Sequence, residues 1–278
     1  MDITFLESLL FGFVSGVSEF MPVSSVAHQQ MMLRLFGQNS LYPLLGLFIH
    51  IGMLAAVVYA CMNHLQHMKR EEQIRRIPKR RRRRQPDHQM IMDTALVKGA
   101  CVPMLLGYVF YLSISKWENL LPTSAAILVL NGLVLHIPVY FTSGNKDSRS
   151  MTRLDGIAIG LSSALGVLPG MSRIGVAYSY GSVRAADYAQ VYKWCLLLSI
   201  PALFLHVIFD LILLFTLGLT GVELLFVVYC ILAAVMAWLG ATLAIRFARL
   251  MCTRTGLGGL SYYCWGVALF MFILYLYT

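Results

Sequence analysis

The sequence is poor in charge: only 13% of its 278 residues are Asp, Glu, Lys or Arg, whereas 58% are hydrophobic. A soluble domain has roughly a quarter charged residues and roughly half apolar ones. Too few polar side chains are present to cover the surface of a water-soluble fold of this size. The shortage of charge therefore excludes a soluble globular protein and indicates a chain embedded in a membrane.

The sequence also lacks paired cysteines and a cleavable leader. Its six cysteines are scattered in or beside apolar segments without a Cys-x-x-Cys pair, so neither a metal site nor a disulfide framework is expected. The first residues are acidic, with Asp2 and Glu7, and no small-residue cleavage site follows them. We expect free thiols that pack as small core residues and an amino-terminal segment that is retained.

Six apolar runs are long enough to cross a bilayer, which takes about 20 helical residues. They cover residues 41–61, 96–114, 124–141, 194–217, 224–245 and 257–277. Two further apolar segments, 3–35 and 155–188, are broken by Gly, Pro and Ser. Broken backbone at membrane depth is tolerated only inside protein or beside a water-filled cavity. We therefore predict an all-α integral membrane fold, in which one membrane domain (1–278) has six transmembrane helices and two re-entrant helical hairpins.

Positive charge is concentrated in one connection. Residues 66–90 hold ten Lys or Arg against three acidic residues. The positive-inside rule places this loop in the cytoplasm, and the basic connections 146–153 and 246–254 then fall on the same side. The run 79–84 could also indicate nucleic acid binding, but between two spans it more readily contacts anionic lipid headgroups. We expect lipid headgroups, and no nucleic acid, as partners of this loop.

The two broken segments match each other after a shift of 147 residues, which aligns Pro22 with Pro169 and Ser25 with Ser172. Each half then has one hairpin followed by three spans. We predict two repeats, residues 1–141 and 155–278. An odd number of spans per half inverts the second copy, and inverted repeats place their site where half-helix ends meet. The alternative is chance similarity between two kinks rich in Gly, Ser and Pro.

Ionisable side chains stand at both breaks, although such residues are costly at membrane depth and usually functional. Glu19 and His28 flank the first break, and Arg173 follows the second. The guanidinium fork matches phosphate oxygens, and a serine such as Ser25 can attack phosphorus if a base takes its proton. His28 shares a helix face with Ser25 if this turn is helical. The set predicts phosphoryl transfer, and the alternative is a buried Glu–Arg pair that only joins the hairpins.

Both breaks resemble motifs of the undecaprenyl-pyrophosphate phosphatase family of the bacitracin-resistance type. The first family motif is Glu-Gly-x-Thr-Glu-Phe-x-Pro-Val-Ser-Ser-Thr-Gly-His, and the chain reads Ser15-Gly16-Val17-Ser18-Glu19-Phe20-Met21-Pro22-Val23-Ser24-Ser25-Val26-Ala27-His28. The second is Pro-Gly-x-Ser-Arg-Ser-Gly-x-Thr, and the chain reads Pro169-Gly170-Met171-Ser172-Arg173-Ile174-Gly175-Val176-Ala177. Two shorter stretches also look like the family: His50-Ile51-Gly52 and Leu198-Ser199-Ile200-Pro201-Ala202.

The resemblance, which covers most of the chain, implies hydrolysis of undecaprenyl pyrophosphate to the monophosphate. This reaction recycles the lipid carrier of peptidoglycan synthesis at a site in the bacterial inner membrane that opens to the outer face. The resemblance further implies Ser25 as nucleophile, Glu19 and His28 in acid–base or metal roles, and Arg173 as the clamp on pyrophosphate. The other substrate-binding candidates are Ser24, Ser172, Gly170, His50 and Ser15.

The cofactor implied by the resemblance is a divalent cation, Mg or Ca, with Glu19 as its candidate ligand. A polyprenyl pyrophosphate lipid is the expected partner, and a homodimer is left open. His50 could instead be a packing residue, since lone membrane histidines often are. Asp155 is expected to cap the helix that opens the second hairpin.

Among the departures from the family motifs, four bear on the binding of phosphate or a cation. Ser15 replaces a Glu, so a cation shared by two carboxylates would lose one ligand. Val26, Ile174 and Ala177 replace hydroxyl side chains that could donate to phosphate. Two alternatives follow: a relative that binds or flips polyprenyl phosphates without turnover, and a transporter of an unrelated small anion.

Overall fold

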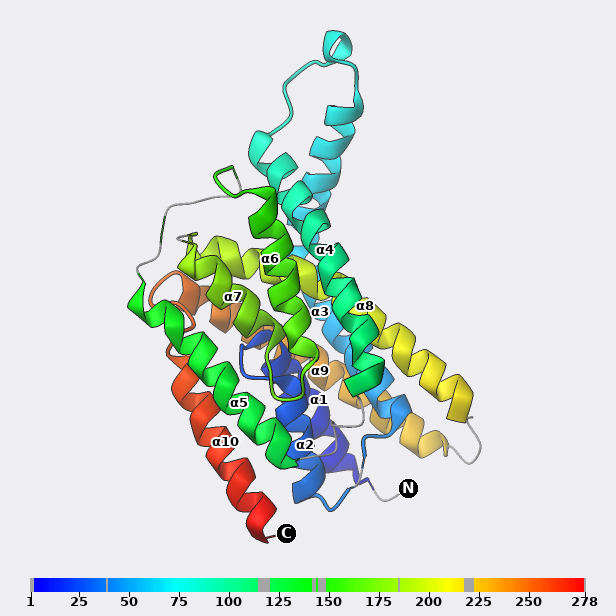
Figure 1. Ribbon diagram of the computed structural model, residues 1–278. Helices are drawn as coiled ribbons and strands as arrows, with labels where there is room; N and C mark the ends of the chain where they lie inside the picture. Colours follow the sequence, from blue (N-terminus) through cyan, green and yellow to red (C-terminus); the bar gives the residue numbers. More distant parts are fainter. Residues whose placement is uncertain are drawn as a thin grey trace.

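The computed structural model describes residues 3–38, 40–114, 121–141, 144, 149–184, 186–217 and 223–277. Over these residues the chain is helical and forms no strand (Figure 1). The helices are α1 (Phe5–Phe20), α2 (Ser25–Leu35), α3 (Pro43–Arg76), η1 (Lys79–Arg81), α4 (His88–Ile114), α5 (Leu121–His136), η3 (Ile137–Tyr140), α6 (Arg153–Ala164), η4 (Leu165–Val167), α7 (Arg173–Val183), α8 (Tyr188–Leu217), α9 (Leu224–Cys252) and α10 (Leu260–Tyr277). The predicted all-α class is confirmed.

Six helical segments in the described part of the chain are long and apolar enough to cross a membrane. They are Pro43–Arg76, His88–Gly107, Leu121–Tyr140, Tyr188–Thr216, Leu224–Cys252 and Leu260–Tyr277. Each overlaps one of the six predicted spans, although the ends differ. The prediction of six spans in a multi-pass membrane protein is therefore confirmed.

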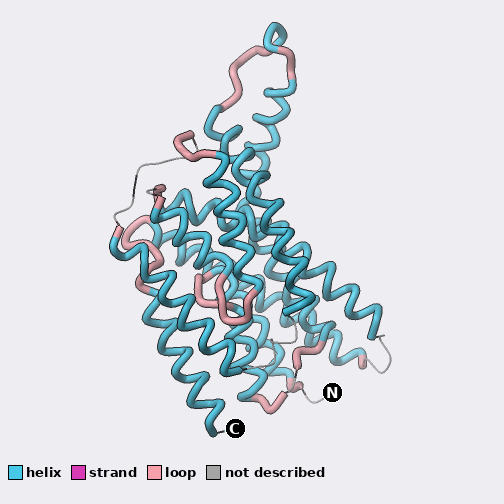
Figure 2. The backbone as a smooth tube through the Cα atoms, viewed as in Figure 1, coloured by secondary structure: helices cyan, strands magenta, loops and turns pink. Residues whose placement is uncertain are grey.

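The basic segment 66–90, predicted as a loop, is mostly helix. Helix α3 continues to Arg76 and α4 already begins at His88. Lys, Arg, Glu and Gln are good helix formers, so the change from apolar to charged residues does not end α3. The helix ends before Pro78, because a proline disfavours helical geometry in the preceding residue. Figures 1 and 2 show the resulting projection at the end of the bundle opposite both termini.

Helices α1 and α2 form one helical hairpin, and α6, η4 and α7 form another. Each begins with a capping box, made by Thr4 with Glu7 in the first and by Thr152 with Asp155 in the second. Asp155 thus takes part in the cap, as predicted, although the N-cap residue itself is Thr152. Figure 1 shows that both hairpin turns lie midway along the bundle and that the hairpins enter it from opposite ends.

Small residues allow α1 to pack closely against α9. A Cβ atom on Gly12 would stand 2.2 Å from the carbonyl oxygen of Ala233, and one on Gly16 would stand 2.2 Å from that of Ala237. In lipid, helices associate through close van der Waals packing, which such small residues permit. This contact holds the end of α1 in place, where Glu19 lies.

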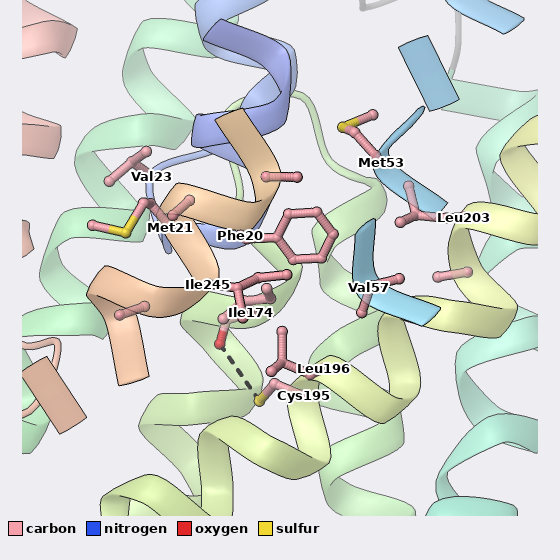
Figure 3. Close-up of a cluster of buried hydrophobic side chains, with 14 of the residues drawn as sticks. Phe20, Met21, Val23, Met53, Val57, Ile174, Cys195, Leu196, Leu203 and Ile245 are labelled. Carbon is pink, nitrogen blue, oxygen red and sulfur yellow. Dashed lines mark hydrogen bonds between the residues drawn. The ribbon is translucent and has the colours of Figure 1, made fainter. Parts of the chain in front are cut away.

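An apolar cluster lies against both hairpin turns, as Figure 3 shows. Phe20 of α1 is fully buried, and Ile174 of α7 is 1% exposed. Side chains from three spans surround them, among them Val57, Leu196 and Ile245. The cluster joins the inner ends of α1 and α7 to the spans. All six cysteines are free, as predicted.

Candidate active site

A cavity of about 50 Å³ lies between the two hairpin turns, α3 and α8. Residues of both Pro-x-x-Ser breaks line it. Its lining residues are Ser18, Glu19, Ser24, Ser25, Val26, Gln29, His50, Gly166, Val167, Met171, Ser172, Arg173 and His206. The structure therefore brings together residues that are about 150 positions apart in the sequence, as the alignment of the halves predicts.

Glu19 connects the two hairpins chemically. Its Oε1 forms an ion pair with Nη2 of Arg173, and its Oε2 accepts a hydrogen bond from Ser25 Oγ at 2.5 Å. The side chains of Arg173 and Glu19 are only 7% and 14% exposed. A buried carboxylate and guanidinium are stable together, but removing either one leaves an uncompensated charge. The contact to Ser25 places a base at the serine proton.

Ser24 and Ser25 stand at the start of α2 in an unusual backbone conformation. Ser24 has φ 67° and ψ 105°, a region that residues other than glycine rarely adopt. Such conformations are costly and concentrate at functional sites, where they aim side chains. Ser24 also accepts a hydrogen bond from the backbone N–H of Ala27 as the helix cap. The turn therefore presents Ser25 to the cavity at the positive end of a helix.

The second break has the same design. Ser172 caps α7 by accepting a hydrogen bond from the N–H of Gly175 at 3.1 Å, and Arg173 is the first helical residue. The starts of α2 and α7 both border the cavity, so two helix dipoles favour an anion there. Together with the guanidinium of Arg173, they make the cavity suited to phosphate.

Asn131 of α5 joins the two breaks, and sequence reasoning missed it. Its side-chain amide donates to the carbonyl oxygen of Pro22 at 3.0 Å, and its Oδ1 accepts from the N–H of Ser172 at 2.8 Å. The residue is fully buried. A buried side-chain amide in an apolar span was the available signal, because polar groups in hydrocarbon need partners.

Asn131→Ala is expected to destabilise the protein and disturb the site. It leaves the Pro22 carbonyl and the Ser172 N–H buried without this partner, at about 1–3 kcal/mol for each group. Thermal unfolding in detergent should show a clear fall in melting temperature. Leu130→Ala, on the exposed face of the same helix, is the matched control and should change it far less. Equal melting temperatures for the two variants would contradict the bridging role of Asn131.

His28 does not line the cavity, although sequence reasoning groups it with Ser25. Its Nδ1 donates to the carbonyl oxygen of Ser24 at 2.7 Å, and its Nε2 lies 2.9 Å from Tyr263 Oη. The ring faces a separate apolar pocket between α1 and α10. In this structure His28 therefore contacts the strained Ser24 and is absent from the described lining of the cavity.

Ser15 and Gly170 also lie away from the cavity lining. Ser15 is fully buried and accepts a hydrogen bond from Gln29, whose side chain does line the cavity. Gly170 has φ +100°, and a Cβ there would stand 2.3 Å from the carbonyl oxygen of Ser124. Its requirement for glycine therefore comes from a tight turn against α5, not from the cavity.

Two of these four departures from the family motifs do not line the cavity. Ile174 and Ala177 are each 1% exposed and belong to the apolar core. Their side chains are absent from the described lining, and the effect of the lost hydroxyl groups on phosphate binding stays a prediction. Val26 does line the cavity, so one wall there is apolar.

The predicted divalent cation finds few protein ligands. Among the described residues no group of three His, Cys, Asp or Glu could hold a metal ion. Glu19 is the only carboxylate among the described residues of the lining, and both of its oxygens contact Arg173 or Ser25. The side chains that the structure brings together thus do not form a metal site by themselves.

Two residues of α8 were not predicted. His206 lines the cavity beside His50, and their rings stack with centroids 4.9 Å apart. Asp210 lies behind them, with Oδ2 2.5 Å from Nδ1 of His50. The signal was available, since both side chains are ionisable and lie within a predicted span.

The geometry agrees with the comparisons to known proteins. A family model described as "Bacitracin resistance protein BacA" matches residues 8–270. The chain is 28% identical to the undecaprenyl-diphosphatase of Methanobrevibacter smithii, with 98% of each chain covered. It is 29% identical to undecaprenyl-diphosphatase 1 of Shouchella clausii, with 96% of this chain and 95% of the relative covered. The match to nearly the whole sequence and the two facing breaks lead to one conclusion: the chain belongs to the bacitracin resistance protein BacA family.

Proposed function

We propose that this protein hydrolyses undecaprenyl pyrophosphate, or a similar polyprenyl pyrophosphate, to the monophosphate and inorganic phosphate. The observation that carries the proposal is the contact of Glu19 with both Ser25 and Arg173 in one cavity. It unites a nucleophile, its base and a phosphate clamp. The undecaprenyl-diphosphatase names of the relatives support the same reaction.

In the first step Glu19 takes the proton of Ser25, whose Oγ attacks the terminal phosphorus. The bond from this phosphorus to the bridging oxygen breaks, and the polyprenyl monophosphate leaves. Arg173 and the N–H groups at the starts of α2 and α7 stabilise the charge on the transferred group. Water then hydrolyses the phosphoserine, and Glu19 returns its proton to Ser25.

The two hairpins are proposed to be re-entrant and related by an inverted repeat. In support, α1 packs mainly against α9 of the second half, and α6 packs mainly against α4 of the first. An inverted repeat produces such exchanged contacts. Both turns lie midway along the bundle, where lipid tolerates irregular backbone only if protein encloses it.

The cavity is proposed to open to the outer face of the bacterial inner membrane. The basic projection between α3 and α4 supports a cytoplasmic position for that end of the bundle, where exposed arginines would contact anionic headgroups. The α1–α2 hairpin enters from the opposite end. Of the second basic connection, residues 146–148 lie outside the described residues.

A direct test measures phosphate release from a polyprenyl pyrophosphate by the purified protein in detergent. The wild type should release phosphate well above the rate of the double variant Ser25→Ala, Arg173→Ala. Equal rates for the two proteins would refute the hydrolase and favour a lipid-binding relative. Inorganic pyrophosphate as a second substrate tests whether the lipid is needed for turnover.

We propose that a divalent cation assists: Glu19 would be the residue that holds it, and the ion would supply positive charge to the phosphate groups. Ser15→Glu restores the second carboxylate of the family motif, next to Gln29 at the cavity wall. We expect half-maximal phosphate release at a magnesium or calcium concentration about tenfold lower than in the wild type, because one more anionic ligand is present. Ser15→Gln adds the same length without charge and is the control. An unchanged cation dependence in Ser15→Glu would remove the carboxylate pair as a metal site.

A further inference from the structure

Helices α3 and α8 form one side of the cavity, where a histidine of the wall pairs with a carboxylate. His50 of α3 lines the cavity, and Asp210 of α8 contacts it from behind, with 2.5 Å between Nδ1 and Oδ2. The two side chains are 17% and 18% exposed. An ionisable pair at this depth in a span is expensive and therefore suggests a function.

The local geometry determines which nitrogen of His50 is available. The carboxylate of Asp210 accepts the Nδ1 hydrogen, so Nε2 is the nitrogen left to act as a base towards the cavity. His206, one turn before Asp210, stacks on the imidazole at an interplanar angle of 15° and restrains its rotation.

The proposed reaction needs a second base, and this inference rests on that proposed function. After the first step Glu19 holds the proton of Ser25 and must return it when the phosphoserine breaks. A protonated carboxyl group cannot also take a proton from the attacking water. His28, the other candidate from the sequence, contacts Ser24 and Tyr263 outside the cavity.

We propose that His50 is the base that activates water to hydrolyse the phosphoserine at residue 25, and that Asp210 is its positioning residue. Water oxygen bonds to phosphorus while its proton moves to Nε2 of His50. The bond between phosphorus and Ser25 Oγ breaks, and Oγ takes the proton from Glu19. Hydrogen phosphate leaves, and His50 then releases its proton to solvent.

Ionisable side chains from three other helices contact His50 or line the same cavity. Asp210 and His206 come from α8, Glu19 from α1 and Arg173 from α7.

The first experiment compares wild type with His50→Gln by acid quench during turnover. The variant should release about one polyprenyl monophosphate per protein in a rapid burst and then turn over about 10²-fold more slowly. Mass spectrometry of the quenched variant should find phosphate on Ser25. A merely structural defect would slow the burst as well and would leave no phosphoserine.

The second experiment makes the same acid-quench measurement on Asp210→Asn, which keeps the size of the side chain and removes its charge. An amide is a weaker acceptor for the Nδ1 hydrogen of His50, so kcat should fall about tenfold while the burst keeps its wild-type rate and phosphoserine accumulates. His64→Gln is the matched control. His64 lies on the same helix as His50, about 21 Å further along α3, and it also pairs with a carboxylate, that of Asp93 at 3.6 Å. Its burst and its kcat should match the wild type, and no phosphoserine should accumulate.

The outcomes separate this inference from the proposed function. A wild type without turnover would refute the hydrolase itself. An active wild type, with no phosphoserine in either His50→Gln or Asp210→Asn, would overturn the role of His50 alone. If His50→Gln does not elute as a folded protein, the presence or absence of phosphoserine in Asp210→Asn decides.

Discussion

Replacing Ser25 with alanine is expected to reduce phosphate release by at least about 10³-fold, since removal of a serine nucleophile in a hydrolase typically costs more than this. The hydroxyl of Ser25 donates to Glu19 and borders the cavity, so it is the group placed to attack phosphorus. No other described hydroxyl hydrogen-bonds to that carboxylate. Substrate binding should persist, because Arg173 and both helix starts remain.

The experiment measures phosphate release and lipid binding on the same preparation. Ser24→Ala is the neighbouring control: it removes a cap, which costs about 1 kcal/mol of stability, but leaves the nucleophile in place. A Ser25→Ala variant that retains more than about a tenth of wild-type turnover would mean that water attacks phosphorus directly, with Glu19 as its base. It would also remove the phosphoserine on which the role of His50 depends.

Replacing Arg173 with lysine is expected to lower kcat/KM by about 10²-fold, and replacing it with alanine by about 10³-fold or more. Lysine keeps the charge but loses the planar fork that binds two oxygens at once. Arg173 is 8% exposed and pairs with Glu19, so alanine also leaves a buried carboxylate alone. This second effect should destabilise the protein by about 3–5 kcal/mol.

A double-mutant cycle separates the two roles of Arg173. Glu19→Gln removes the charge that Arg173 neutralises. The double variant Glu19→Gln, Arg173→Ala should therefore lose less free energy of unfolding than the sum of the losses in the two single variants. Turnover should be nearly absent in all three variants. Additive stability effects would argue against the ion pair, and activity in Arg173→Ala close to wild type would argue against the phosphate clamp.

Much of the architecture was predictable because its signals are local. Six runs of apolar residues identify the spans, whatever surrounds them. The breaks at Pro22 and Pro169 follow from missing backbone donors and restricted torsion angles, and the cap at Asp155 follows from the short polar side chain at a helix start. The pairing of Glu19 with Arg173 was foreseen as an alternative, since charges at membrane depth need partners. The length of α3 was not foreseen, because charge alone does not end a helix.

The departures from the family motifs were harder to judge from the sequence. Ile174 and Ala177 were read as lost phosphate donors, yet both point into the core. A motif gives the order of side chains but not the face on which each lies. That face depends on how α7 is rotated against its neighbours, which packing around Phe20 and Leu196 decides.

The sequence by itself determined the membrane class, the spans, the paired breaks and the residue types of a phosphate site. Only the tertiary structure decided which of them meet. Asn131 bonds to Pro22 across 109 residues, and Asp210 reaches His50 across 160, while His28 is drawn away to Tyr263. These contacts depend on the relative depth and rotation of whole helices. No local pattern encodes that arrangement, because it results from the packing of many side chains at once.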